Sequence, residues 1–88
     1  MARLRKLVKR FLAGPPDLRF DEVRSLLAAF GFVEVRASGS HHMFRNAEGQ
    51  MIVVPRSGGS RVKRAYARRI VELLNLETWH AEFRPRGR

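Results

Sequence analysis

Apolar residues recur at helical spacing in three segments of the chain. Residues 2–13 carry leucine, valine or phenylalanine every three to four positions, which predicts a short amphipathic helix ended by the glycine and two prolines that follow. Residues 20–30 form a second apolar stripe closed by Gly31, a residue suited to the left-handed position after a helix. Residues 62–74 predict a third helix, and residues 75–83 add a further turn.

Three short runs between the second and third helical segments predict β-strands. They cover residues 32–37, 41–45 and 51–55, separated by a glycine-centred turn and by a hairpin loop that ends in Gly49. The order is therefore helix, three antiparallel strands and helix, preceded by an extra N-terminal helix. This predicts an α+β protein with a double-stranded-RNA-binding-like fold. Two helices would cover one face of the sheet, and the other face would be open to solvent.

Charge narrows the class of partner. Eighteen lysines and arginines stand against eight acidic residues, a formal net charge of +10, and the cations gather in three blocks at residues 3–10, 56–69 and 84–88. Such blocks favour a polyanion as the binding partner, and arginine in particular binds phosphate through two parallel hydrogen bonds. The chain has no cysteine, which excludes disulfides, thiolate metal sites and cysteine nucleophiles and fits a cytoplasmic protein. No apolar run approaches the roughly 20 residues that a membrane span needs.

Two adjacent histidines are the candidate chemical groups. His41 and His42 begin the second predicted strand, where neighbouring side chains point to opposite faces, so the pair cannot readily hold one metal ion. The scattered carboxylates form no two-metal pattern. His42 shares a strand face with Phe44, which predicts a half-buried structural residue. RNA carries its own nucleophile, the 2′-hydroxyl, so one histidine among arginines suffices for metal-free cleavage.

Several motifs, in this order and spacing, resemble a known family. They are the segments Leu26–Phe32, Gly39–His42, Asn46–Gly49 and Val53–Pro55, followed by the basic third helix. Together they are similar to the HicA toxins of bacterial toxin–antitoxin systems over about residues 18 to 76. The resemblance implies a ribosome-independent mRNA interferase that a HicB-type antitoxin neutralises. It also implies that the histidine of the Gly-Ser-His motif, here His41, is catalytic. Many members carry another histidine shortly after the strand-ending proline, whereas here that proline precedes Arg56.

These observations define the expected organisation and partners. Residues 1–16 form a basic helix and proline-rich turn, residues 17–80 the nuclease domain, and residues 81–88 a basic, disordered tail. The expected partners are mRNA and a HicB-like antitoxin, with no cofactor, no metal and no membrane. Beside catalytic His41, the predicted RNA-binding residues are Ser40, Arg45, Arg56, Arg61, Lys63 and Arg64. A non-catalytic RNA-binding module and a degenerate toxin that acts as a protein-interaction partner remain alternatives.

Overall fold

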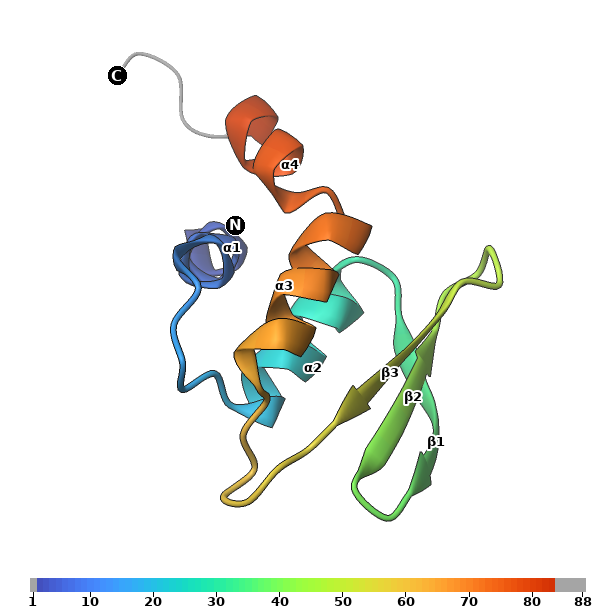
Figure 1. Ribbon diagram of the computed structural model, residues 1–88. Coiled ribbons are helices and arrows are strands. Elements are labelled where there is room, and N and C mark those ends of the chain that lie inside the picture. Colours follow the sequence, from blue (N-terminus) through green and yellow to red (C-terminus); the bar gives the residue numbers. More distant parts are fainter. Residues whose placement is uncertain (1, 84–88) are drawn as a thin grey trace.

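A computed structural model describes residues 2–83 of the chain. It confirms the predicted α+β class and the order of its core elements (Figure 1). The elements are α1 (Ala2–Ala13), α2 (Phe20–Ala29), β1 (Val33–Ser38), β2 (His41–Arg45), β3 (Met51–Pro55), α3 (Arg64–Leu73) and α4 (Leu76–Phe83).

The three strands form one antiparallel sheet in the order β1-β2-β3. Gly39 and Gly49 make the two hairpin turns with positive φ angles of 60° and 85°, a conformation that costs glycine little. One feature departs from the predicted alternation: β1 contains a β-bulge between Glu34 and Arg36, and the strand begins at Val33. The bulge changes which side chains of β1 point to which face of the sheet, because one residue of β1 there has no partner on β2.

The hydrophobic core lies between the sheet and the helices. Figure 1 shows α2 and α3 on one side of the sheet and no helix on the other. Phenylalanine, leucine and valine fill the space between the layers because the helical stripes and alternate strand positions all face inward. The core residues with 2% exposure or less are Val8, Phe11, Leu18, Phe20, Val23, Leu26, Leu27, Phe32, Phe44, Val54, Val62, Ala67, Ile70 and Leu76.

Helix α1 packs on the helical layer, on the side away from the sheet (Figure 1). It buries Val8 and Phe11 in the common core. The Arg10 guanidinium also forms ion pairs with Glu22 of α2 and with Asp17 in the loop between α1 and α2. The extra N-terminal helix is therefore part of the same hydrophobic core as the strands and helices that follow it.

The C-terminal segment is more regular than the predicted single turn. Asn75 has a positive φ of 54° and ends α3, after which α4 runs on to Phe83. Leu76 anchors α4 in the core, and the Trp79 ring meets the Phe30 ring edge-on at 5.7 Å. Helix α4 therefore includes the first three residues of the predicted disordered tail, 81–83, and the rest of that tail lies outside the described residues.

The second face of the sheet is open, as predicted. Its apolar side chains include Val33, Met51 and Val53, which are 62%, 52% and 41% exposed. Exposed apolar side chains on an uncovered sheet face are typical of a surface that binds a partner.

Candidate active site

His41 lies on the open face of the sheet, directly after the Gly39 turn. It pairs with Ser38 of β1 and Pro55 of β3 in the strand register, and it is exposed. Because side chains alternate along β2, His41 shares this face with Met43 and Arg45. Around it is a shallow hollow of about 180 Å³, lined by Arg36, Ser38, His41, Met43 and Val53. An RNA strand laid across the open face can therefore reach the imidazole.

His42 occupies the opposite face, in the core beside Phe44. It is 5% exposed, its ring centroid lies 4.4 Å from that of Phe20, and its Nδ1 is 2.5 Å from Glu34 Oε2. The Nε2 atom is buried and has no partner among residues 2–83. His42 is therefore more deeply buried than predicted. The structure confirms that the two histidines face opposite sides of the sheet, and only His41 is accessible from solvent.

Glu34 holds His42 in one orientation. The hydrogen bond from His42 lowers the pKa of the Glu34 carboxyl, and the positive charges of Arg24 and Arg56 lower it further. Partial burial raises this pKa, but by less, so the net shift is downward. An ionised carboxylate only accepts hydrogen bonds, so His42 Nδ1 carries the proton of this bond. In a neutral imidazole the buried Nε2 is then an acceptor without a donor.

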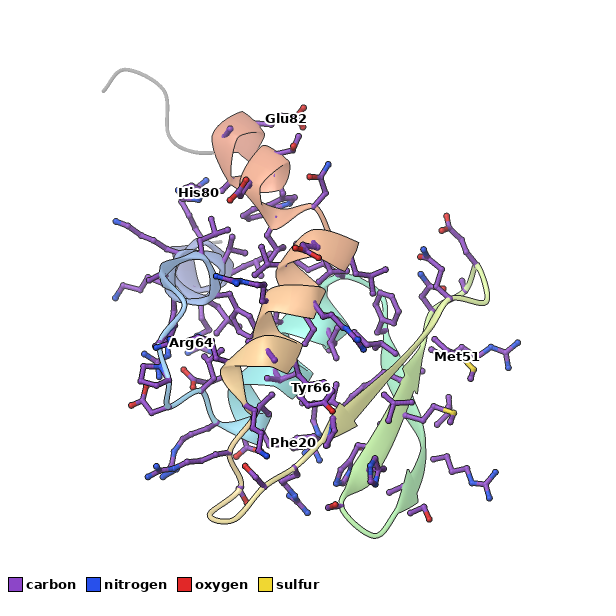
Figure 2. All side chains as sticks on the ribbon, in the orientation of Figure 1. Phe20, Met51, Arg64, Tyr66, His80 and Glu82 are labelled. Atoms are coloured by element: carbon purple, nitrogen blue, oxygen red, sulfur yellow. The ribbon has the colours of Figure 1, made fainter. Side chains whose placement is uncertain are left out.

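The Phe20 ring supports two guanidinium groups. The Arg24 and Arg56 guanidinium carbons lie 5.1 Å and 5.0 Å from its centroid, within the range of cation–π attraction. Arg24 is also 3.4 Å from Glu34 Oε1. Figure 2 shows Phe20 between the helical layer and the sheet, at the end of the molecule where the β1–β2 turn lies. A fixed positive charge is thereby held beside that turn.

The loop after β3 brings further predicted residues to the same end. The Arg56 amide donates to the Ser40 carbonyl at 2.7 Å, which ties the loop to the Gly39 turn. The backbones of Ser57 and Arg61 then close a small ring through hydrogen bonds in both directions. The Phe20 amide at the start of α2 donates to the Ser60 carbonyl at 2.7 Å. The Arg56 backbone is therefore next to Ser40, while its guanidinium lies over Phe20 on the face opposite His41. Arg61 lies in the same loop, and Lys63 follows two residues later at the start of α3.

Two predicted residues lie elsewhere. Arg45 ends β2, opposite Met51 and about 13 Å along the strand from His41. Arg64 lies on the side of α3 that faces α1 (Figure 2), where it lines a separate groove together with Gly14. The predicted set therefore divides into a group around His41 and two outlying arginines.

The structure adds four residues to this site that the sequence pattern does not indicate. Phe20, Arg24 and Glu34 surround His42, and Arg36 lies beside His41 on the open face. The register of the first hairpin pairs Arg36 with Met43, so pairing the two strands on paper would have placed Arg36 near His41. The contacts of Phe20 depend on how α2 packs, and no local pattern reveals them.

Residues 2–83 contain no group of three histidine or acidic side chains that could hold a metal ion. None of the helices described is long and apolar enough to cross a bilayer.

We expect Glu34 to make folding stability sensitive to acid. Its pKa is lower in the folded chain than in the unfolded chain, so its contribution is complete above the ordinary glutamate pKa of about 4.3. The contribution is lost as pH falls through the lower, folded-state value. Urea unfolding across this range should therefore show a steeper acid loss of unfolding free energy in the native chain than in Glu34→Gln. Parallel pH curves for the two proteins would contradict this role.

Comparison with known proteins assigns the chain to a family. Residues 20–76 match the family described as the HicA toxin of bacterial toxin–antitoxin, a span from the first residue of α2 to the start of α4. Neither the curated proteins nor the solved structures that were searched gave a match. The matched span contains the whole sheet, His41 and the loop after β3, and it leaves out α1. This chain belongs to the HicA toxin family and is the toxin half of a toxin–antitoxin pair.

Proposed function

We propose that the chain is a metal-independent endoribonuclease that cleaves mRNA with His41 as its general acid or base. The observation that carries the proposal is the position of His41. It is exposed on the open face, in the same hollow as Arg36, and it directly follows Ser40, whose carbonyl accepts a hydrogen bond from the Arg56 amide. His41 and Arg36 together offer a proton-transfer group and a cation on one accessible surface.

The chemistry needs little more than these groups. His41 takes the proton from a ribose 2′-hydroxyl, whose oxygen attacks the adjacent phosphorus. The bond from phosphorus to the 5′-oxygen of the next nucleotide breaks, and that oxygen leaves with a proton from a solvent water molecule. The product ends are a 2′,3′-cyclic phosphate and a 5′-hydroxyl. Arg36, in the same hollow as His41, would neutralise the charge that grows on the phosphorane oxygens, and Arg56 and Arg61 in the loop after β3 would hold neighbouring phosphates. Cations fixed in place before the reaction stabilise that charge without reorganising.

We expect RNA cleavage to continue in excess EDTA, because the donor set contains only a histidine and arginines. The assay is digestion of a defined RNA with and without chelator, followed by analysis of the product ends. A 2′,3′-cyclic phosphate would support the mechanism. Activity that disappears in EDTA and returns with Mg²⁺ would contradict it.

RNA affinity should depend strongly on salt. Contacts with about five phosphates of a single strand give a slope of log affinity against log salt near −3.5, about −0.7 for each contact. The measurement is RNA binding by a His41→Ala variant from low to physiological salt, and a flat response would contradict the electrostatic surface. Arg61→Gln should reduce the slope by about 0.7. Arg45→Gln is the matched comparison at the far end of β2, and an equal reduction there would mean that the RNA also crosses that end of the open face.

A non-catalytic RNA-binding module is the second candidate. It is favoured by one observation: no hydrogen bond or ion pair joins the His41 side chain to another residue in the described range, so nothing there orients the imidazole. The same digestion separates the candidates, because a binding module leaves the RNA intact.

The partner of the toxin is an antitoxin protein, and we propose that it is of the HicB type. Net charge supports a partner rich in acidic residues, since the toxin carries a formal charge of +10.

A further inference from the structure

The free edge of β3 is the second surface of interest. β3 is the last strand in the order β1-β2-β3, so one of its edges has no neighbouring strand. The Asn46 amide donates to Gln50, and the Arg56 amide donates to Ser40. In an antiparallel ladder, residue pairs that are hydrogen-bonded to each other alternate with pairs that are not. Residues 50 and 56 both bond to the β2 side, so residues 50, 52, 54 and 56 direct their amides and carbonyls towards β2. Met51 and Val53 consequently direct their amides and carbonyls away from the sheet.

A groove runs along this edge between β3 and α3. Its volume is about 580 Å³, and its walls are residues 51–54 together with Tyr66, Arg69, Glu72 and Leu73 of α3. Four consecutive strand residues line it, although their side chains alternate between two faces. A hollow that meets all four must therefore lie along the backbone edge of the strand. We call this hollow the β3 groove.

The walls of the β3 groove suit an extended peptide. Leu73 is 41% exposed, and Tyr66 and Ile52 are partly exposed, so the α3 side offers apolar contacts for alternate side chains of an added strand. Figure 2 shows Tyr66 between α3 and β3, with Met51 on the opposite, outer side of the sheet. Backbone pairing supplies affinity in such strand addition, and the side-chain pockets supply selectivity.

The other edge of the sheet is less suited to strand addition. β1 carries the bulge between Glu34 and Arg36, which interrupts its run of hydrogen-bonding groups. No bulge interrupts β3, which pairs with β2 at every position from Met51 to Pro55. The regular edge is thus the one that lies beside a groove.

Charge selects between the possible occupants. A second copy of this chain would bring another +10 charge against the first, which opposes β3-to-β3 pairing. The groove is lined by one cation, Arg69, and one anion, Glu72. Arg45 lies opposite Met51, in the last residue pair between β2 and β3. An acidic segment is attracted by the overall charge and by both arginines. Membership of a toxin family supplies the protein partner that such a segment requires.

We propose that the antitoxin adds an acidic, extended segment to β3 as a fourth strand, with alternate side chains in the β3 groove. The segment would lie about 10 Å from β2, because neighbouring strands are about 4.8 Å apart. It would extend the open face next to Val53, which borders the His41 hollow. The docked segment does not contact the His41 imidazole, so this proposal is independent of whether the chain cleaves RNA.

Amide hydrogen exchange tests the proposal residue by residue. The full chain, carrying His41→Ala so that it can be produced in quantity, is measured alone and in its purified complex with the antitoxin. The amides of Met51 and Val53 should exchange at least about tenfold more slowly in the complex, since new hydrogen bonds protect them. The Ala37 amide, which faces outward on the β1 edge, should not change.

Two pairs of variants test the same surface by affinity. Val53→Pro removes the outward amide and leaves the ladder to β2 in place, whereas Val53→Ala keeps the amide, so only the first should weaken antitoxin binding, by about tenfold. Leu73→Glu places an anion in the β3 groove and should also weaken binding. Ala65→Glu makes the same charge change at an exposed position of α3 outside the groove and should not.

Each contrary result is decisive. A complex in which Met51 and Val53 exchange as fast as in the free chain overturns the proposal, as does equal binding by the two Val53 variants. Protection of these amides in a dimer of the free chain would assign the edge to a second copy. Failure to form any complex with the antitoxin also overturns it. None of these results depends on the RNA digestion, so the two proposals can fail separately.

Discussion

Replacing His41 with alanine should lower the rate of RNA cleavage by about 10²–10⁴-fold, the usual contribution of a general acid or base. The change should leave the fold intact. The side chain is exposed and makes no hydrogen bond within the described residues, so the free energy of unfolding should change by no more than about 1 kcal/mol. The measurements are single-turnover cleavage by the purified variant and growth after its induction in cells. The variant should still bind the antitoxin.

His42→Ala is the matched control on the same strand. It removes a side chain that is 5% exposed and deprives the Glu34 carboxylate of its hydrogen-bond donor. It should therefore cost about 2 kcal/mol or more of unfolding free energy. Cleavage by the folded fraction should persist. A folded but inactive His42→Ala beside an active His41→Ala would mean that the roles of the two histidines are reversed, and two active variants would remove histidine catalysis altogether.

The sequence predicts this sheet well because its turns are marked locally. Gly39 and Gly49 take positive φ angles in the two hairpins, and Pro55 ends the third strand, so the bounds of β2 and β3 follow from residues within the hairpins themselves. The bulge in β1 has no such mark. Its residues alternate well enough to suggest a regular strand, and only pairing against β2 shows that one of them is extra.

The site was predictable only as far as it depends on strand alternation. Opposite faces for His41 and His42 follow from adjacent positions on one strand, and the structure confirms them. The hydrogen bond between His42 and Glu34 depends on strand register and on the bulge, and the separation of Arg64 from His41 depends on where α1 packs. Asn75 is the other source of error: a left-handed asparagine breaks the helical stripe, so the sequence predicts only a turn where the structure has α4.

Phe20 links the stability of the core to the charge of the site. It is fully buried, and its ring lies 4.4 Å from that of His42 and 6.1 Å from that of Phe44. The same ring supports the guanidinium groups of Arg24 and Arg56. A substitution here should therefore alter two properties, whereas a core substitution that touches no arginine should alter one.

Phe20→Ala should lower the unfolding free energy by about 3–5 kcal/mol, a large share of the stability expected for a domain of this size. Phe44→Ala should cost a similar amount, because Phe44 is 1% exposed in the same core. Urea unfolding measures both. If Phe20→Ala unfolds at the same urea concentration as the native chain, the packing described for α2 is wrong.

The milder leucine variants separate the two roles of Phe20. Leucine keeps most of the apolar volume and removes the ring face, so Phe20→Leu and Phe44→Leu should both stay folded and lose similar stability. Only Phe20→Leu should also weaken RNA binding, because Arg24 and Arg56 lose a cation–π contact of about 0.5–1 kcal/mol each and with it the fixed position of their guanidinium groups. RNA titrations at low salt, with each variant at a temperature where it is fully folded, provide the comparison. Equal RNA affinity of the two leucine variants would show that Phe20 packs the core without positioning the arginines of the site.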